Sequence, residues 1–254
     1  MRSVLMILML LSSAFMGCLS EENDERNINL VVEYGQANGT IVQSYVDGDL
    51  VSTSNVTIEF NFSKTLAGGD LVEYGIKLSN GTTDLSVNPK EDFLISVDFS
   101  EHGIYDIIAY AIDNHGQSSN MSIVVRIDLK MEWSESSTYE PENMIIDPSP
   151  KNGGSHASFI LIDSTVSNPE LIQDIGGGRE VEITWGLFDE QDDSCQYRNG
   201  RVNEGESVRW KTVHFNTFEV HELRISYDEG QDDIVVDQTV LIEYPHIEST
   251  PNSY

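Results

Sequence analysis

The chain has 254 residues, of which 43 are acidic and 14 basic, so its formal net charge at pH 7 is −29. This balance argues against nucleic-acid binding, which needs clustered lysine and arginine. It suits a well-solvated surface in a salty exterior, where ionic strength screens self-repulsion. Hydrophobic residues make up 39% of the chain, which is enough for packed domains and argues against a disordered stalk.

Residues 1–17 have the pattern of an export signal. Arg2 precedes an apolar run from Val4 to Leu11, and Gly17 stands directly before Cys18. The run is shorter than the about 20 apolar residues that a membrane-spanning helix needs. A positive start, a short apolar core and small residues near the cut are typical of a signal peptide. We therefore expect export and leave residues 1–17 out of the fold.

The pair Gly17 and Cys18 resembles the end of the lipoprotein signal of bacterial and archaeal envelope proteins, although Phe15 and Met16 depart from that pattern. The resemblance implies that Cys18 becomes the lipidated first residue and that the protein sits on the outer face of the cell membrane. Stable anchoring takes two chains, so we expect a diacyl or dialkyl group on the Cys18 sulfur. The alternative is an ordinary secretory signal in which Cys18 carries no lipid.

Residues 18–27 are expected to form the lipidated cysteine and a short tether. The segment is almost entirely polar after Leu19 and includes Glu21, Glu22, Asp24 and Glu25. Such a composition does not bury enough surface to fold. Ten extended residues reach about 30 Å, so the folded part should stay close to the membrane.

The chain has two cysteines, Cys18 and Cys195. If Cys18 carries lipid, Cys195 has no partner in its own chain, and core packing must hold the fold without a disulfide framework. We expect the Cys195 thiol to be inert or to form an occasional intermolecular bridge.

From about residue 28 onward, short alternating runs recur between clusters of Gly, Asn, Asp and Ser, which predicts an all-β sandwich. In the clearest run, Tyr105, Ile107, Ala109 and Ala111 share one face, and a turn follows at 113–116.

Two stretches in residues 28–130 resemble the PKD domain, an immunoglobulin-like sandwich of extracellular proteins. The resemblance is carried by Gly103, Tyr105, Ile107, Ala109, Ala111, Asp113 and Gly116, and by the earlier Val72, Tyr74, Ile76, Leu78, Asn80 and Gly81. The family's run of Trp, Asp, Phe, Gly, Asp and Gly is not kept. The resemblance implies an Ig-like sandwich.

The second half of the chain repeats this plan, with longer loops between strands of constant length. Val181, Ile183, Trp185 and Leu187 correspond to Val72, Tyr74, Ile76 and Leu78; Phe215, Val220, His221 and Leu223 correspond to Phe99, Ile104, Tyr105 and Ile107. Chance alternation is the alternative. We expect Trp185 to pack between two sheets rather than to stack on a ligand.

The predicted fold class is therefore two tandem immunoglobulin-like, PKD-like β-sandwiches behind a signal peptide and an acidic tether. The predicted ranges are 1–17 signal peptide, 18–27 tether, 28–132 first sandwich, 133–245 second sandwich and 246–254 tail. Because Ile127, Leu129, Met131 and Trp133 keep alternating across the boundary, we expect a nearly continuous strand to join the sandwiches.

No motif for nucleophilic, metal or phosphate chemistry stands in the context that it needs, so the sequence predicts no enzyme and no catalytic residue. His214 and His221 are interpreted as surface or half-buried histidines rather than a zinc pair, because no other ligand stands near them in the sequence.

Two acidic clusters are the site-like feature of the second half. We expect their loops to meet at one end of the sandwich, where carboxylates could hold Ca²⁺. Neither cluster has the spacing of a known calcium loop, and solvated turns are the alternative. The candidate ligands are Asp189, Glu190, Asp192, Asp193, Asp228, Glu229, Asp232 and Asp233.

Five glycosylation sequons lie in the first half. Their asparagines are Asn38, Asn55, Asn61, Asn80 and Asn120. A chain rich in Asn, Ser and Thr contains about half this number of sequons by chance. The clustering of the sequons in the first half fits a glycosylated stalk.

The function expected from these observations is a membrane-anchored extracellular lipoprotein, held by lipid on Cys18, that acts as a non-catalytic binding, adhesion or structural module for a protein or carbohydrate at the cell surface. One alternative is an accessory subunit of a surface transporter or secreted-enzyme complex, which an exposed apolar patch on the second half would favour. Another is a calcium- or carbohydrate-binding module. No other cofactor is expected.

Overall fold

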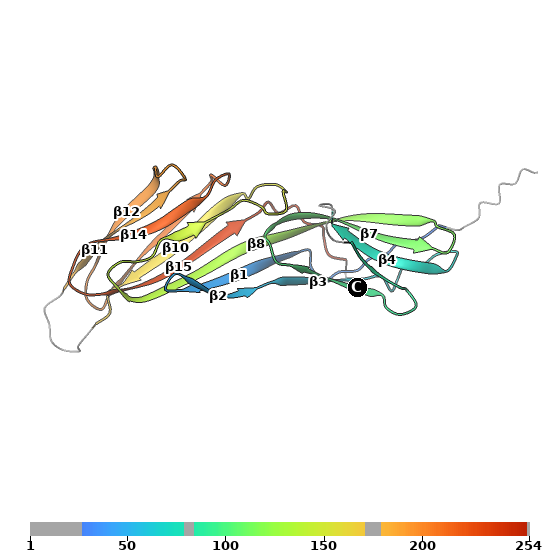
Figure 1. Cartoon of the computed structure of the whole chain (residues 1–254), viewed down its shortest axis with the longest axis horizontal. Coiled ribbons are helices and arrows are strands. Elements are labelled where there is room, and N and C mark those ends of the chain that lie inside the picture. The colour runs from blue at the N-terminus through green and yellow to red at the C-terminus, as the bar shows by residue number, and fades with distance from the viewer. Residues whose placement is uncertain (1–26, 79–83, 171–178, 253–254) are drawn as a thin grey trace, which may run out of the picture.

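The computed structural model describes residues 27–78, 84–170 and 179–252. Within these ranges every regular element is a β-strand (Figure 1), which confirms the all-β class that the alternating pattern predicts. The strands are β1 (Asn38–Val46), β2 (Asp49–Ser54), β3 (Val56–Asn61), β4 (Leu71–Leu78), β5 (Asp84–Val87), β6 (Leu94–Phe99), β7 (Gly103–Asp113), β8 (Ser118–Thr138), β9 (Met144–Ile146), β10 (Phe159–Ser167), β11 (Val181–Phe188), β12 (Ser194–Val202), β13 (Ser207–His214), β14 (His221–Glu229) and β15 (Ile234–Glu243).

The strands form one large sheet and two smaller ones. The large sheet has nine strands, ordered β13-β10-β15-β8-β7-β4-β5, with β1 paired to β8 and β2 paired to β1. The pair β3-β6 covers the β4, β5 and β7 end, which we call the proximal half. The sheet β12-β11-β14-β9 covers the other end, the distal half. The result is an elongated β-sandwich (Figure 1).

The strand β8 runs through both halves without a break. It pairs with β7 over Ser118–Ile127 and with β15 from Leu129 onward, and β1 lies parallel to it over 126–134. The residues predicted to alternate across the junction, Ile127, Leu129, Met131 and Trp133, are all buried in β8. The division at residue 132 therefore falls inside one strand, and it stays a prediction. The β1–β2 hairpin pairs with the part of β8 that lies in the distal half.

Aromatic side chains hold the two layers of the proximal half together. The rings of Phe62 and Tyr74 stack with centroids 4.9 Å apart, and Phe99 meets Tyr105 edge to face at the same separation. Val72 does not share the buried face of Tyr74, Ile76 and Leu78. A register irregularity between Leu71 and Glu73 interrupts the pairing of β4 with β7, and the Val72 side chain is exposed.

The distal half is packed around Trp185, as the sequence predicts. This side chain has no exposed surface, lies 6.2 Å from the Trp210 ring of the opposite sheet, and donates from Nε1 to Oγ of buried Ser164 at 2.8 Å. A buried indole N–H needs such a partner. Trp185 is therefore a core residue that joins the two sheets.

The strand pairing of the proximal half is similar to that of the distal half. The pairs β3-β6 and β10-β13 correspond, as do β4-β5-β7 and β11-β12-β14. Tyr105 and His221 are both buried at the equivalent positions of β7 and β14. The equivalence of Phe215 with Phe99 is wrong. Because β13 ends at His214, Phe215 lies in the following loop and is 72% exposed, whereas Phe99 is a core residue of β6.

The segment after β15 forms hydrogen bonds at the junction between the two halves, which we call the waist. Ser249 exchanges two hydrogen bonds with the backbone of Val124, at 2.9 Å each. The Tyr244 amide donates to Asp128 at 2.9 Å, and its hydroxyl lies 2.8 Å from Nδ1 of buried His102. The C-terminal segment thus ties β8 to both halves of the large sheet.

Candidate functional site

Two rows of side chains cross the outer face of the distal half of the large sheet. The strand register sets Ser44, Glu132, Thr239 and Asp163 side by side in one row, and Val46, Ser134, Asp237, Thr165 and Arg209 in the next. Alternate residues of β10, namely Ile162, Ser164 and Val166, are buried. Successive side chains of a strand point to opposite faces, so both rows face outward.

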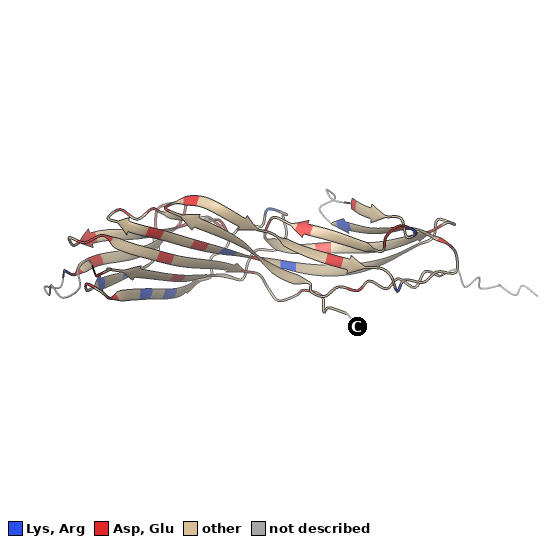
Figure 2. Cartoon of the chain, turned by 90° about the horizontal axis from the view of Figure 1, so that it is seen from below, with Lys and Arg blue, Asp and Glu red and all other residues tan. Residues whose placement is uncertain are grey.

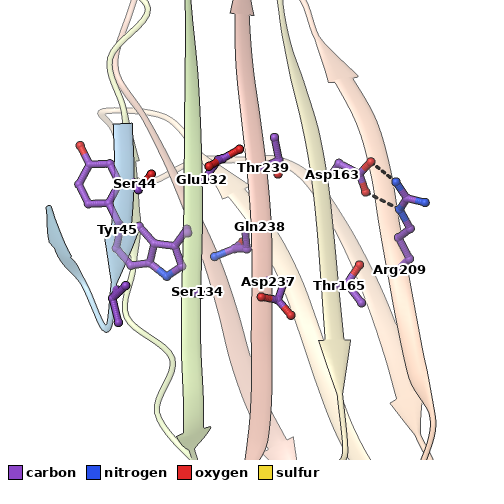
Figure 3. A pocket seen from close by; sticks show the side chains of 12 residues that line it. Ser44, Tyr45, Glu132, Ser134, Asp163, Thr165, Arg209, Asp237, Gln238 and Thr239 are labelled. Atoms are coloured by element: carbon purple, nitrogen blue, oxygen red, sulfur yellow. Dashed lines mark hydrogen bonds and ion pairs between the residues drawn. The ribbon is translucent and has the colours of Figure 1, made fainter. Parts of the chain in front are cut away.

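These two rows line a hollow of about 400 Å³, which we call the polar basin (Figure 3). Tyr45, Trp133 and Gln238 also contribute to its lining. Five strands, β1, β8, β15, β10 and β13, supply the lining residues. The volume falls in the range of small-molecule sites, and the hydrogen-bonded sheet holds its polar groups in fixed positions.

The basin carries more negative than positive charge. Its ionic side chains are Glu132, Asp163, Asp237 and Arg209. The Arg209 guanidinium donates to both carboxylate oxygens of Asp163 (Figure 3). These hydrogen bonds and the guanidinium charge hold the pKa of Asp163 below its usual range. Glu132 accepts from Lys130 at 2.5 Å, and Asp237 is exposed.

A buried polar layer lies beneath the basin. Trp133 stacks on Tyr45 with centroids 5.3 Å apart and donates from Nε1 to the buried Glu135 carboxylate at 2.7 Å. The other carboxylate oxygen of Glu135 accepts from the Glu142 amide at 3.0 Å. Gln238 is 3% exposed, and its Oε1 has no hydrogen-bond partner in the described part of the chain. A fixed layer below the floor preorganises the groups above it.

The lining residues offer hydroxyl, carboxylate, amide and guanidinium groups, with no cysteine or histidine among them. Such groups donate and accept hydrogen bonds, so the basin can hold a polar ligand at several points at once.

The predicted calcium ligands do not form one cluster. The strands β11 and β14 are antiparallel, with Phe188 opposite Glu222 at one end and Glu182 opposite Glu229 at the other. Residues 189–193 follow the first end, and residues 228–233 lie at the second. The expectation that the two loops meet at one end is wrong, because their loops leave antiparallel neighbours in opposite directions.

Within the first cluster, Asp189 caps its own turn by accepting from the amides of Gln191 and Asp193 at 3.0 and 2.9 Å. Asp192 pairs with Arg224 at 2.6 Å, and Glu190 accepts from the Val220 amide at 3.1 Å. These contacts fix the turn by hydrogen bonds of its own. Calcium binding by this cluster stays a prediction.

In the second cluster, Asp232 is 1% exposed and pairs with Arg179 at 2.9 Å. Asp228 accepts from the Thr184 hydroxyl at 2.6 Å, Glu229 is exposed and Asp233 is half-buried. One carboxylate of this cluster therefore has a structural role, and its calcium binding is likewise a prediction.

The remaining predicted sites lie mostly on the surface. Asn38, Asn55 and Asn120 are exposed and Asn61 is half-buried, whereas Asn80 and Cys18 lie outside the described residues. Among the residues that the structure describes, no helix is long and apolar enough to cross a membrane. Figure 2 shows that acidic residues are spread over the strands and loops along the length of the molecule.

Sequence reasoning missed the polar basin. Its charged residues come from four strands that are far apart in the chain, and no local motif joins Glu132, Asp163, Arg209 and Asp237. The available signal was a polar residue at alternate positions of each strand. That signal also describes any solvated sheet face, so it does not predict a site.

The comparisons leave the family open. No protein-family model matches the chain, and no curated protein matches its sequence. Among solved structures, a structure of carbohydrate-binding modules from the β-sandwich superfamily aligns with 84% of this chain and 96% of its own, at 7% identity and a TM-score of 0.32.

Two further solved structures cover smaller shares of their own chains. A Bacteroides uniformis β-glucuronidase aligns over 85% of this chain and 30% of its own, at 9% identity and a TM-score of 0.29. The SGBP-B protein of the Bacteroides ovatus mixed-linkage glucan utilization locus, in complex with a mixed-linkage heptasaccharide, aligns over 81% and 52%, at 11% identity and a TM-score of 0.22. With TM-scores below 0.5, function is argued from this chain's own residues.

Proposed function

We propose that the protein is an exported, lipid-anchored, non-catalytic binding module that holds its distal half away from the membrane surface. The observation that carries this proposal is the unbroken strand β8, Ser118–Thr138, which belongs to both halves of the large sheet. A shared strand leaves no linker about which the halves could swing. The module acts as a stiff spacer between its anchor and its ligand.

The position of the N-terminal segment supports this orientation. Asn29 pairs with Leu66, and the Asn114 amide donates to the Asp70 carbonyl at 2.8 Å. Both contacts lie at the pole of the proximal half that is remote from the distal half, where β7 ends and β8 begins. A lipid on Cys18 would hold this pole at the membrane, with the distal half outward.

The anchor is tested by intact mass and detergent-phase partitioning of the natively expressed protein beside a Cys18→Ser variant. We expect the native chain to begin at residue 18, to carry the mass of two hydrocarbon chains and to enter the detergent phase, with the variant in the aqueous phase. Equal partitioning without a lipid mass would contradict the anchor and favour a freely secreted binding protein.

For the ligand, we propose a carbohydrate bound in the polar basin. Its carboxylates, hydroxyls and the Arg209 guanidinium lie on a rigid sheet and match a ligand rich in hydroxyl groups. Asp237 and Arg209 are exposed, so their substitution should leave the fold intact.

A glycan array probed with the wild-type chain tests this proposal. Asp237→Asn and Arg209→Gln should each weaken any glycan detected by about 10-fold, the cost of one charge-assisted hydrogen bond. Glu59→Gln, an exposed acid in β3 of the proximal half, should leave binding unchanged. A glycan bound equally by all four proteins would place the site elsewhere, and an array without a bound glycan would reject this ligand class.

A second candidate function is an accessory subunit of a surface complex, favoured by exposed apolar side chains on the distal half. Tyr197, Val213, Phe215 and Phe218 are all exposed, and Phe215, Phe218 and Tyr197 each expose more than 70% of their surface. Gln196 donates to the Val213 carbonyl at 3.1 Å, which places β12 beside the end of β13. Exposed aromatic residues of this kind are typical of docking surfaces.

Cross-linking in intact cells tests the docking role. A photoreactive residue at position 215 should capture a specific partner, and one at exposed Asp106 of the proximal half should not. Identical cross-linking from both positions would argue against the distal docking surface.

A further inference from the structure

Three possible metal ligands of the distal half, remote from one another in the chain, come together at the end nearest the waist. Cys195 lies in β12, His214 ends β13 and His221 begins β14. One ligand atom from each lies within 4.8 Å of the other two. The two imidazole rings meet edge to face with centroids 4.5 Å apart.

We propose that Cys195, His214 and His221 bind a single Zn²⁺-class transition-metal ion through one thiolate and two imidazoles. Imidazole and thiolate are the ligands that such ions prefer, whereas Ca²⁺ and Mg²⁺ take oxygen. This site is separate from the polar basin and uses none of the carboxylates proposed for calcium, although Cys195 lies beside Asp193 of the first acidic cluster.

The hydrogen bond of His221 fixes which of its nitrogens can bind a metal. Its Nε2 lies 2.9 Å from the backbone carbonyl oxygen of Asn216, which only accepts, so Nε2 carries the proton and donates. The lone pair of the neutral ring is therefore on Nδ1. A metal-bound histidine commonly donates its second N–H to a carbonyl in this way.

The remaining nitrogens are buried without partners. Nδ1 of His221 and Nε2 of His214 have no hydrogen-bond partner among the described residues, and His221 is only 1% exposed. A buried acceptor left unsatisfied destabilises the folded state. Coordination of a cation would satisfy both atoms at once.

The geometry requires only a small adjustment. With metal–ligand bonds of about 2.0–2.3 Å and tetrahedral angles, the ligand atoms of such a site stand roughly 3.4–3.6 Å apart. The three ligand atoms now lie within 4.8 Å of one another, so they would have to approach by about 1 Å to bind one ion. Cys195 is exposed at the surface, so its side chain can move toward the histidines.

The strand contacts beside the cluster keep the ligands together. Thr212 donates to Oε1 of Gln196 at 2.7 Å, and Nε2 of Gln196 donates to the Val213 carbonyl at 3.1 Å. These bonds join the edge strand β12 of one sheet to the edge strand β13 of the other, next to Cys195 and His214. The bound ion would add a further link between the sheets.

The electrostatic surroundings favour a cation. Three acidic residues, Asp189, Glu219 and Asp193, act electrostatically on Cys195. Their negative charges attract a cation to this end of the distal half.

The chain supplies three ligands, and exposed Cys195 lies at the solvent side. Three protein ligands leave the fourth tetrahedral position to water or to a donor from outside the chain. The docking aromatics Phe215 and Phe218 belong to the loop between the two histidines. An ion here would therefore fix the loop that carries them.

The test is Co²⁺ titration of the purified, chelator-treated chain, with excess Ca²⁺ present to occupy acidic surface groups. The wild type should show the visible bands of tetrahedral Co²⁺ and a near-ultraviolet thiolate charge-transfer band, both lost on adding one equivalent of Zn²⁺. Cys195→Ser should lose the charge-transfer band, and His214→Gln should bind Co²⁺ at least about 10-fold more weakly.

Two matched variants serve as controls. His246→Gln removes an exposed histidine outside the cluster, and Asp193→Asn removes an exposed carboxylate beside it. The first should leave the titration unchanged, and the second should shift the affinity less than His214→Gln while keeping the charge-transfer band. Absence of that band in the wild type, or equal Co²⁺ affinity of the wild type and both ligand variants, would overturn the site.

Discussion

Arg126 and Glu248 form a two-point ion pair at the waist, with Nε to Oε2 and Nη2 to Oε1 distances both of 3.1 Å. Arg126 also donates to Asp128, and Glu248 accepts from Asn38 at 2.9 Å. One carboxylate of the C-terminal segment is thus bonded to β8 and to the first residue of β1.

Glu248→Gln should destabilise the protein by about 1–3 kcal/mol, because a charged acceptor is lost from a largely buried network. Hydrogen bonding to Arg126 lowers the pKa of Glu248 to about 2, so its contribution is complete above about pH 4.5 and is lost as the pH falls toward 2. Urea unfolding at pH 7 and pH 3 measures the difference, which should shrink at the lower pH. Glu59→Gln is the control, and an equal effect of both variants would contradict the role of the pair.

His102 should make the protein sensitive to mild acid. Burial lowers the pKa of this histidine to about 4, below its usual 6.5, so the folded state binds fewer protons than the unfolded state between these values. Its contribution to stability is therefore complete above about pH 6.5 and is lost as the pH falls toward 4, a change of about 3 kcal/mol. Unfolding free energies from pH 7 to 4 should fall less steeply for His102→Gln than for wild type. Parallel curves would contradict the prediction.

Phe99 and Phe215 correspond when the two halves of the sequence are aligned, but their contributions to the free energy of unfolding should differ sharply. Phe99→Ala removes a core ring and should cost about 3–5 kcal/mol. Phe215→Ala removes a loop side chain that is 72% exposed, and its effect should stay within about 0.5 kcal/mol. Denaturant unfolding of the two variants measures both losses of stability. Similar losses would show that the Phe215 side chain is packed in solution and would contradict the prediction.

The hydrogen bond between Trp185 and Ser164 should appear as a coupling energy. Trp185→Phe leaves the Ser164 hydroxyl buried without its donor, at a cost of about 1–3 kcal/mol beyond the loss of ring area. Ser164→Ala should reduce that extra cost in the double variant. A double-mutant cycle measured by urea unfolding gives this coupling energy directly. Additive effects of the two substitutions would show that the hydrogen bond contributes nothing to stability.

Asp232 should contribute to the thermal stability of the protein even when no metal ion is present. Asp232→Asn removes the negative partner of Arg179 at a buried position and should lower the melting temperature in chelator. Asp193→Asn changes an exposed acid and should leave melting in chelator unchanged. If calcium binds one acidic cluster, substitution in the other should leave that binding unaffected, because the clusters lie at opposite ends of β11 and β14. Thermal melts with and without Ca²⁺ separate these effects.

Local pattern was enough to predict the all-β class and part of the core. Period-two alternation placed Tyr105, Ile107, Ala109 and Ala111 on a buried face, as observed. Val72 does not follow this alternation, because the pairing of its strand is irregular between Leu71 and Glu73 and its side chain is exposed. Alternation describes a strand reliably only while its pairing stays regular.

The alternation of apolar residues along single strands does not predict contacts between distant segments of the chain. Nothing in residues 38–46 indicates that β1 runs parallel to β8, and no spacing rule brings Cys195 to His214 and His221. Such neighbours depend on which edge strands of two facing sheets meet, and packing of the whole sandwich decides that. The polar basin was missed for the same reason.

The unbroken β8 also has a mechanical consequence. If the proposed lipid holds the proximal half and the proposed ligand binds the distal half, a pull between them would act along this strand. It would load the β1–β8 and β8–β15 ladders in shear. In shear, many backbone hydrogen bonds resist together, whereas a peeling force would open them one after another. The halves should therefore bear tension as one body, and neither should stretch or unravel before the other yields.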